Sequence, residues 1–560
     1  MNLANLQQLL KQKNISAYLL TRNNMFWGED ILPDENKIME ISGFTGSAAL
    51  MLITPQKAWL LVDGRYSIQT RQETNGTNIT VYDSTDGPAD ILKLCRQNNI
   101  NELAYNPWCL TVSAVNLFKR NSALKLISAP DLITGILNNN PIKVFAHELK
   151  YSGKSADEKC YEVANRLKDQ ADAMLICNPA QVSWLLNLRS HTLPDTPILR
   201  AFALLHADGG CCAYADNCNC KNIKPFAELF TDLQQLSGKK LAIDIHTTPQ
   251  YIFEQLPQNI KTVQLPNNPL LELKLSKNHT ELQGFADAHL RDGVAVTKFL
   301  YWLENNWQGK TELDVVAMLK QFRQEQDLFF SDSFGTIAAS GANAAIVHYQ
   351  PGNTGNAALN ANSVLLLDSG AQYFDGTTDV TRTIALGTPS EEIKNDFTAV
   401  LKAHLALSDA VFPVGTAASA LDAVCRAQLW KYGKDYRHGT GHSVGHFSDV
   451  HESPFGISPR NNMPIQENYI TSIEPGVYFE GKYGIRIENL AYTVKAEYDG
   501  FLKFKNLTLI PIDKRLINKY MLSVGEQNLL NGYHRQVFDC LAPYMTAAEK
   551  EWLCKVCSPL

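Results

Sequence analysis

Short apolar runs separated by turn residues predict strands in the first part of the chain. Runs of strand length occupy residues 17–20, 48–53 and 58–62, and the last two are separated by residues 54–57 (Thr-Pro-Gln-Lys), which are typical of a hairpin. Residues 63–66 (Asp-Gly-Arg-Tyr) then predict a turn. We therefore expect a first block in which strands and helices alternate.

A second block with the same order of elements begins near residue 150. Residues 155–158 have the sequence of a helix-capping box, residues 173–177 predict a strand, and residues 179–186 predict a short helix. The segments YLLTRNN and MLICNPA hold corresponding places in the two blocks. This correspondence predicts two duplicated α/β domains.

A third block opens with apolar residues spaced three and four apart between residues 280 and 305, which is the period of an amphipathic helix. Another helix is predicted from Ser390 towards Ser408, because Ser390 begins a capping sequence. Residues 511–560 predict a helical tail that is too short to fold alone. We expect this tail to pack on the third block or on a second subunit.

The length and the charge limit the class of protein. A chain of 560 residues needs more than one hydrophobic core, and the blocks give domains at residues 1–145, 146–270 and 271–510, with 511–560 as a C-terminal extension. The formal net charge of -6 is small for this length and favours neither nucleic acid nor an anionic membrane as a partner. No stretch reaches the roughly 18 apolar residues that a membrane-spanning helix needs.

The N-terminus and the cysteines favour a cytoplasmic protein. The segment MNLANLQQLLKQKN predicts an amphipathic helix and lacks the apolar core and the cleavage site of a signal peptide. The 12 cysteines are scattered without the pattern of a disulfide scaffold, which fits a reducing compartment. Cys211, Cys212, Cys218 and Cys220 could form a zinc site, but their spacing matches no familiar zinc motif, and we favour chance proximity near a hairpin.

One pair of acids lies around a predicted turn. Asp368 ends the apolar run 364–367, so a buried strand would deliver its carboxylate to the end of a sheet. Asp379 follows in a segment rich in β-branched residues, and the turn dipeptide Asp375-Gly376 lies between the two acids. A hairpin would bring both carboxylates to one pocket. For this pair alone, a turn cap at Asp368 and a solvated strand residue at Asp379 are equally consistent with the sequence.

A second pair of acids lies symmetrically about a glycine. Glu474 and Glu488 are each seven residues from Gly481, so a reversal there would place them nearly opposite on neighbouring strands. Opposed like charges destabilise a sheet unless something positive lies between them. A cation is the explanation that we favour. Arg486, on the same strand face as Glu488, could instead neutralise part of the charge in a structural salt bridge.

Histidines are concentrated in the same block. Residues 438–446 place histidines between glycines, which predicts a loop that brings imidazoles to one site. His451 follows this loop, and His348 precedes it in the chain. A hydrogen-bonded or exposed imidazole is the simpler interpretation of any one of these residues, but not of the cluster.

Five of these side chains have the donors of a two-metal centre: Asp368, Asp379, His442, Glu474 and Glu488. Sites rich in hard oxygen donors favour divalent ions such as manganese, and two adjacent ions can hold and activate one water. The sequence therefore favours a metal-dependent hydrolase.

The same residues resemble the pita-bread metallopeptidases, the fold shared by methionine aminopeptidase, prolidase and aminopeptidase P. The segments LLLDSGAQYFDGTTDVTRT, HGTGHSVGHFSDVHE and SIEPGVYFEGKYGIRIENL are similar to the three-domain, cytosolic type of aminopeptidase P, as are SGFTGS, VDGRY, LTLIPID and LNGYH. The resemblance spans nearly the whole chain. It implies an α/β fold class, with two creatinase-like N-terminal α/β domains followed by a pita-bread catalytic domain and a short C-terminal extension.

The resemblance also implies a cofactor and an assembly. The five donor residues would bind two divalent metal ions, expected to be manganese, with Asp379 and Glu488 contributing to both. The family implies a cytoplasmic homodimer, formed partly through the C-terminal extension. Ser443 and His446 differ from the residues that are usual at their positions in the family, which affects the expected substrate preference but not the metal ligands.

The activity implied is release of the N-terminal residue from peptides that have proline in the second position. A hydroxide that bridges the two metal ions would attack the X-Pro bond, with Glu474 as the proton shuttle and His451 stabilising the oxyanion. The resemblance assigns four residues to substrate binding: His348, His438, His451 and Arg486.

Two other functions are compatible with this fold. One is a dipeptidase restricted to X-Pro, which the two added N-terminal blocks and the tail disfavour because they resemble the branch that acts on longer peptides. The other is a non-catalytic binding scaffold, which is disfavoured because all five candidate ligands are present.

Overall fold

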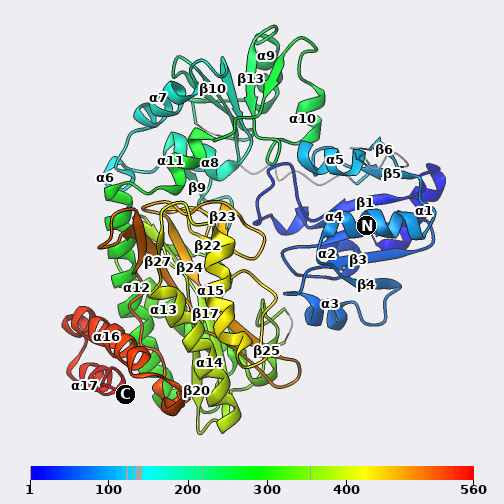
Figure 1. Cartoon of the computed structure of the whole chain (residues 1–560). Helices are drawn as coiled ribbons and strands as arrows, with labels where there is room; N and C mark the ends of the chain where they lie inside the picture. Colours follow the sequence, from blue (N-terminus) through cyan, green and yellow to red (C-terminus); the bar gives the residue numbers. More distant parts are fainter. Residues whose placement is uncertain (1, 121–123, 130–131, 134–141, 219, 354) are drawn as a thin grey trace. The chain divides into compact units, whose positions relative to one another are not determined.

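The computed structural model describes residues 2–120, 124–129, 132–133, 142–218, 220–353 and 355–560 (Figure 1). The chain forms two compact units. The first contains the residues up to 149 together with 154–274, and the second contains residues 150–153 and 275–560. Two short helices, α6 (Leu149–Ser152) and α11 (Pro269–Leu275), lie where the chain passes from one unit to the other.

The first sheet of the first unit has six strands in the order β4-β3-β2-β1-β5-β6. Strand β2 runs antiparallel to both of its neighbours, β1 and β3, and the other neighbouring pairs are parallel. Alternate side chains of β1 enter two hydrophobic clusters, so both faces of the sheet are covered. The elements are β1 (Tyr18–Thr21), β2 (Leu50–Ile53), β3 (Ala58–Val62), β4 (Ile79–Asp83), β5 (Glu102–Tyr105) and β6 (Lys125–Ser128), with α1 (Leu3–Gln12), η1 (Pro33–Glu35), α2 (Lys37–Ser42), α3 (Ser67–Glu73), α4 (Gly87–Gln97) and α5 (Val112–Lys119).

The second sheet repeats the first. Its order is β12-β11-β10-β8-β13-β14, and each pair runs in the same direction as the corresponding pair in the first sheet. The predicted duplication is therefore confirmed, and β1 and β8 occupy equivalent central positions. The elements are β8 (Ala173–Ile176), β10 (Phe202–His206), β11 (Cys211–Tyr214), β12 (Ile223–Lys224), β13 (Lys240–Ile243) and β14 (Lys261–Val263), the small pair β7 (Val144–Ala146) and β9 (Leu188–Ser190), and α7 (Ala156–Leu167), α8 (Pro179–Leu186), α9 (Phe226–Gln234) and α10 (Gln250–Glu254).

Local sequence signals explain several of these elements. Ser155 accepts a hydrogen bond from the backbone of Glu158, and the Glu158 carboxylate accepts one from the backbone of Ser155, so the predicted capping box begins α7. The predicted hairpin between β2 and β3 is closed by the Thr54 N–H, which donates to the Lys57 carbonyl at 2.8 Å. The start of α7 and the turn between β2 and β3 are therefore each specified by residues that lie next to them in the sequence.

The cysteine cluster does not form a metal site among the residues that the structure describes. Cys211 and Cys212 are consecutive residues of β11, so their side chains leave opposite faces of the strand. The sulfur of Cys212 lies near the carbonyl of Ala213, and Cys211 packs against a hydrophobic cluster with Cys218 and Cys220. Chance proximity near a hairpin, the interpretation that we favoured from the sequence, stays a prediction.

The second unit is built from long helices packed on several small antiparallel sheets. The predicted helices at 280–305 and 390–408 are α12 (His279–Asn306) and α14 (Glu391–Ser408), and α14 packs beside α15 (Ala418–Trp430) (Figure 1). Between residues 307 and 510, the other helical segments are α13 (Glu312–Gln324) and η2 (Gly341–Ala345). The strands are β15 (Phe329–Asp332), β16 (Ile337–Ser340), β17 (Ser363–Ser369), β18 (Ala371–Tyr373), β19 (Gly376–Thr377), β20 (Val380–Leu386), β21 (Val411–Pro413), β22 (Gly441–Ser443), β23 (Glu452–Ile457), β24 (Ile470–Ile473), β25 (Gly476–Phe479), β26 (Tyr483–Arg486), β27 (Asn489–Lys495) and β28 (Phe501–Asn506).

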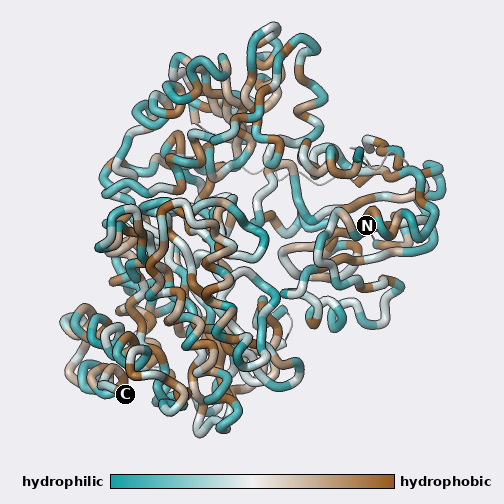
Figure 2. The backbone as a smooth tube through the Cα atoms, viewed as in Figure 1, coloured by the Kyte–Doolittle hydropathy of each residue, from teal (hydrophilic) through white to brown (hydrophobic). Residues whose placement is uncertain are grey.

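The C-terminal tail packs on the second unit, one of the two sites that the sequence allowed. Val537 and Leu541 of α16 share a hydrophobic cluster with Val294 of α12 and Leu553 of α17. The tail alternates between hydrophilic and hydrophobic residues along its helices (Figure 2), as amphipathic helices do. Its elements are η3 (Lys514–Leu516), η4 (Lys519–Met521), α16 (Val524–Leu541), η5 (Ala542–Tyr544) and α17 (Ala547–Val556).

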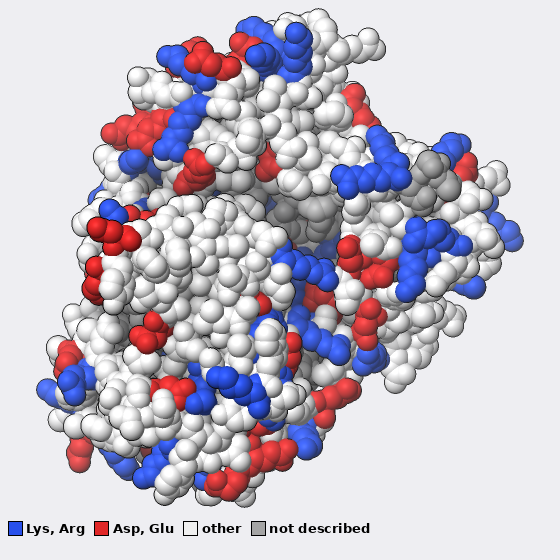
Figure 3. All heavy atoms as spheres, in the orientation of Figure 1, with Lys and Arg blue, Asp and Glu red and all other residues white. Residues whose placement is uncertain are grey.

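The surface carries charges of both signs. On the face drawn in Figure 3, Lys and Arg are interspersed with Asp and Glu. Within the described part of the chain, every helix is too short or too polar to cross a bilayer.

A tight contact in the second unit predicts a difference between two glycine variants. A Cβ at Gly484 would lie 1.8 Å from the Ala344 carbonyl oxygen, whereas Gly481 has a φ of 73° and open space around its Cβ position. Gly481→Ala should therefore cost only the left-handed strain of about 1–2 kcal/mol. Gly484→Ala must displace backbone and should cost about 4 kcal/mol or more. Thermal unfolding followed by circular dichroism compares them, and equal melting temperatures would show that the backbone at Ala344 yields at no greater cost than the left-handed strain at Gly481.

Candidate metal centre

A hairpin brings Asp368 and Asp379 together, as the sequence predicted. β17 and β20 are antiparallel with Asp368 opposite Thr381, and the chain reverses where Tyr373 of β18 pairs with Gly376 of β19. The apolar residues before Asp368 are buried, so β17 is held in the core and its acidic end is fixed. Asp368 and Asp379 are both buried.

A second hairpin places Glu474 opposite Glu488. Ile473 of β24 pairs with Asn489 of β27, and Gly476 of β25 pairs with Arg486 of β26. Both pairs have the same register, and this register places the two glutamates opposite each other. The reversal at Gly481 that the sequence predicted is therefore confirmed. The backbone N–H of Glu488 donates to the Thr381 carbonyl at 3.1 Å, which joins this hairpin to β20.

His442 enters the same region from β22. Its backbone N–H donates to Ser472 Oγ at 2.9 Å, and the preceding Gly441 approaches so closely that a Cβ there would lie 2.0 Å from the Ser472 carbonyl oxygen. The Nδ1 of His442 lies 3.0 Å from the Ser443 carbonyl. Because a carbonyl only accepts, Nδ1 carries the proton and Nε2 presents its lone pair to the acids.

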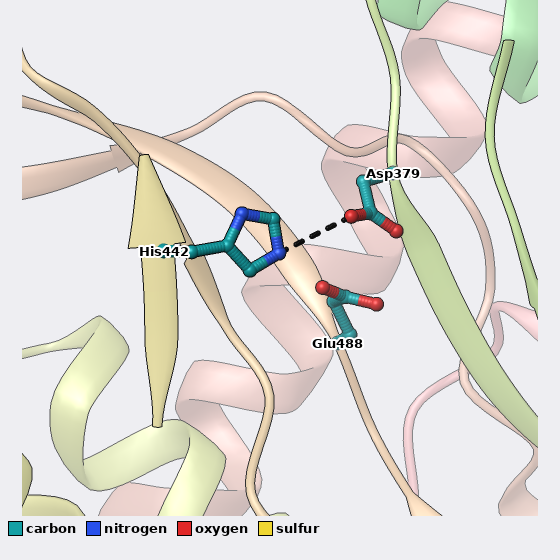
Figure 4. A group of neighbouring side chains, drawn as sticks. All are labelled: Asp379, His442 and Glu488. Carbon is teal, nitrogen blue, oxygen red and sulfur yellow. Dashed lines mark ion pairs between the residues drawn. The ribbon is translucent and has the colours of Figure 1, made fainter. Parts of the chain in front are cut away.

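These three elements converge on one point. Asp379, His442 and Glu488 each offer one donor atom, and the three atoms lie within 4.8 Å of one another (Figure 4). His442 Nε2 lies 3.3 Å from Asp379 Oδ2 and 3.6 Å from Glu474 Oε1. Asp368 and Glu474 border this group, and the charges of the four acids act on one another.

Burial and mutual repulsion raise the pKa values of three of the acids. Burial raises the pKa of Asp368 to about 6, against the opposing effect of Arg486 and with the charge of Asp379 adding to it. Burial also raises the pKa of Glu474, and His442 and Arg486 oppose that shift. The pKa of Glu488 is raised well above its usual value, first by burial and then by the charges of Asp379 and Asp368.

The donor set fits a divalent cation. Asp368 Oδ1 and Asp379 Oδ1 are buried and receive no hydrogen bond from any described residue. Buried polar atoms normally have partners, so two orphaned carboxylate oxygens beside an available imidazole nitrogen indicate a ligand that accepts electron pairs. Two hard cations would both satisfy these oxygens and offset the repulsion among the acids.

Arg486 supplies a positive charge inside the cluster. Its guanidinium donates to Asp368 Oδ2 at 2.5 Å and to the Tyr478 hydroxyl at 2.8 Å. Its ion pair is therefore with Asp368, although the sequence placed it nearest to Glu488. Because Arg486 only donates, the Tyr478 proton goes to His438 Nε2 at 2.8 Å, and His438 Nδ1 donates to the Gly439 carbonyl at 2.7 Å.

The other candidate histidines lie around this centre. The ring of His451 is 4.3 Å from the ring of His442 between centroids, and His438 Nδ1 is 3.8 Å from Glu474 Oε2. His348 is half-buried and follows η2, where the carbonyl of the neighbouring Val347 lies 3.5 Å from Arg486.

Sequence reasoning missed two residues that touch these groups. The Thr381 hydroxyl donates to Glu488 Oε2 at 2.8 Å, and Tyr478 links His438 to Arg486. Thr381 could have been found from the hairpin register, which places it opposite Asp368. No local pattern marks Tyr478, because its partners come from distant parts of the chain.

The two departures from the family have structural partners here. His446 Nε2 donates to the Asp375 carbonyl at 2.8 Å, and the imidazole packs edge-on against Phe285. The Ser443 hydroxyl donates to Glu452 Oε2 at 2.8 Å. His446 and Ser443 therefore attach the histidine loop to neighbouring parts of the second unit.

Four family models match successive parts of the chain. Residues 2–136 and 138–281 each match the Creatinase/Prolidase N-terminal domain, residues 283–495 match Metallopeptidase family M24, and residues 500–560 match the C-terminal region of peptidase_M24. Each of the two duplicated sheets therefore lies in a segment with its own family match, and the second unit contains the other two matched segments.

Known proteins match the chain over its whole length. A protein named Probable Xaa-Pro aminopeptidase P from Laccaria bicolor is 34% identical, over 100% of this chain and 93% of that protein. The crystal structure of X-prolyl aminopeptidase from Caenorhabditis elegans, described as a cytosolic enzyme with a di-nuclear active site, is 31% identical with a TM-score of 0.93, and covers 100% of this chain and 99% of that one.

A prolidase matches a smaller part. The recombinant prolidase from Thermococcus sibiricus is 25% identical with a TM-score of 0.52, and the match covers 64% of this chain and 98% of that one. The pita-bread fold of the second unit and the full set of accessory domains together show that the chain is a hydrolase belonging to metallopeptidase family M24.

Proposed function

We propose that this chain is an Xaa-Pro aminopeptidase, which releases the N-terminal residue from peptides with proline in the second position. The observation that carries this proposal is the convergence of Asp379, His442 and Glu488 in a buried acidic site, in a chain whose whole length matches proteins named for that activity. The structural relative with a di-nuclear active site supports a centre of two divalent metal ions.

Five residues would hold the metal ions: Asp368, Asp379, His442, Glu474 and Glu488. When bound, two divalent ions supply positive charge that polarises the scissile carbonyl and activates water near neutral pH. We propose manganese, because four of the five ligands offer carboxylate oxygen and one offers imidazole nitrogen, a set that suits this ion.

The remaining chemistry is proton transfer and charge stabilisation by the chain. Glu474 has a pKa raised by burial, so it can take a proton from the attacking water and return it to the proline nitrogen as the C–N bond breaks. His451, beside His442, would donate to the carbonyl oxygen as that oxygen gains negative charge. Both groups act from fixed positions, so little reorganisation accompanies the reaction.

Substrate recognition must avoid the proline nitrogen, which carries no hydrogen in the peptide bond. We propose that the four residues named by the resemblance, His348, His438, His451 and Arg486, surround the peptide. The ring nitrogens of His438 and the guanidinium of Arg486 bond protein atoms, so these two residues would orient the site around the peptide.

The cellular setting and assembly are proposed on kinship. The relative described as a cytosolic enzyme supports a cytoplasmic protein. The resemblance in the C-terminal extension supports a homodimer, which sedimentation velocity of the full chain would test.

Peptide length tests the proposal against the prolidase alternative. A tripeptide with proline second should be cleaved at its first bond, whereas an X-Pro dipeptide should be cleaved far more slowly. A chelator should abolish cleavage, and added Mn²⁺ should restore it, because the two ions would supply the charge that polarises the carbonyl and activates water. Cleavage of the dipeptide alone would establish a dipeptidase, and a protein that binds no ion and cleaves neither peptide would be a scaffold.

The proton-transfer role of Glu474 predicts a selective loss of activity. Glu474→Gln keeps the shape of the side chain and should lower kcat by about 10²–10⁴-fold with little change in folding. Glu480→Gln, at the exposed tip of the same hairpin, is the matched control and should keep wild-type kcat. Wild-type turnover in Glu474→Gln would exclude the assigned role.

The raised pKa of Asp368 predicts how metal affinity depends on pH. In the metal-free protein this carboxyl, with a pKa of about 6, holds a proton at lower pH, whereas a metal-bound carboxylate holds none. Mn²⁺ binding should therefore release protons and weaken as the pH falls through about 6. Calorimetry at about pH 5.5 and about pH 7.5, in buffers of different ionisation enthalpy, measures both effects. An affinity that is constant across this range would contradict the shift.

A further inference from the structure

A buried arginine links the C-terminal tail to one of the candidate metal ligands. Arg382, in the middle of β20, is 3% exposed. One of its terminal nitrogens donates to the Glu488 carbonyl at 2.6 Å and to the Thr381 carbonyl at 2.9 Å. The other donates to the Tyr533 hydroxyl at 2.8 Å, and Tyr533 belongs to α16 of the tail.

Among the described residues, every acceptor that Arg382 contacts is neutral. Besides the groups just named, they are the Ile510 carbonyl at 2.8 Å, the Pro511 carbonyl at 3.1 Å and Asn489 Oδ1 at 2.8 Å. A buried charge without a paired counter-charge is costly.

Glu488 is held by two consecutive residues of β20. Its N–H donates to the Thr381 carbonyl, its Oε2 accepts from the Thr381 hydroxyl at 2.8 Å, and its own carbonyl accepts from Arg382. Hydrogen bonds from β20 thus hold both the backbone and the carboxylate of Glu488. A shift of Arg382 would be transmitted directly to the peptide unit that carries this ligand.

Among the acceptors of Arg382 in the described residues, Tyr533 supplies the hydroxyl. A guanidinium only donates, so the Tyr533 oxygen accepts from Arg382 and its proton goes to the Ile510 carbonyl, 2.5 Å away. Tyr533 therefore holds both the guanidinium and the segment whose carbonyls bond it. Phenylalanine would fill the same space and do neither.

We propose that Tyr533 is a positioning residue for the metal centre: through Arg382 it fixes the place of Glu488 relative to Asp379 and His442. This inference rests on the proposed function, because it takes Glu488 as a metal ligand. It makes the C-terminal tail part of the catalytic apparatus rather than only a packing element.

Tyr533→Phe in the full-length chain tests the proposal, with Tyr520→Phe as the control because Tyr520 is 89% exposed. Loss of a hydrogen-bonding partner behind a metal ligand typically weakens binding by about 10–100-fold, and we expect about 10-fold for the more distant Tyr533. The Kd for Mn²⁺, measured by competition with a chelator, should rise in Tyr533→Phe and stay at the wild-type value in Tyr520→Phe. At saturating Mn²⁺, kcat should return towards wild type with an unchanged KM.

Arg382→Lys provides a second, independent variant. It keeps the charge but cannot reach all the acceptors, so its Kd for Mn²⁺ should rise at least as much. The double variant should bind no more weakly than Arg382→Lys alone, because both changes break the same link.

Three results would overturn the inference. A lower melting temperature with an unchanged Kd for Mn²⁺ in Tyr533→Phe would assign Tyr533 a structural role alone. Additive losses in the double variant would show that Tyr533 does not act through Arg382. A wild-type chain that binds no Mn²⁺ would overturn the proposed function itself, which the first two results leave intact.

Discussion

Repulsion among buried carboxylates is the constraint around which the second unit is organised. Asp368, Asp379, Glu474 and Glu488 come from two hairpins that are joined where Glu488 bonds Thr381, and the guanidinium of Arg486 donates to Asp368. Side chains of like charge do not assemble in a protein interior without compensation. The surrounding strands are apolar and tightly paired, so the framework holds the acids in place and leaves compensation to cations.

The sequence predicted the parts of this arrangement that depend on local chain reversal. Turn residues and glycine specify both hairpins, and β-strand alternation then fixes which residues face one another. The duplicated sheets could be predicted because each repeats the same order of short apolar runs. The family resemblance added what periodicity cannot supply, namely that His442 joins acids from two other segments.

Contacts between distant segments could not be predicted from the sequence. The pairing of Arg486 with Asp368 rather than with its neighbour Glu488 depends on how one hairpin lies against the other. The bonds from Arg382 to the tail have the same character, since nothing near Tyr533 in the sequence marks its hydroxyl as special. The histidine loop shows this as well: Ser443 meets Glu452, which forms a buried ion pair with Lys277 at 2.6 Å.

The symmetry of the hairpin about Gly481 limits how this part of the chain can change length during evolution. The strand pairs on both sides of the two glutamates share one register. A single residue gained or lost on one side of the tip would therefore shift the pairing of the following strand by one residue. One glutamate would then point away from its counterpart while the sheet itself could still form. Length variation is therefore compatible with the site only where insertions occur in matched numbers on both arms, or as a bulge confined to the tip.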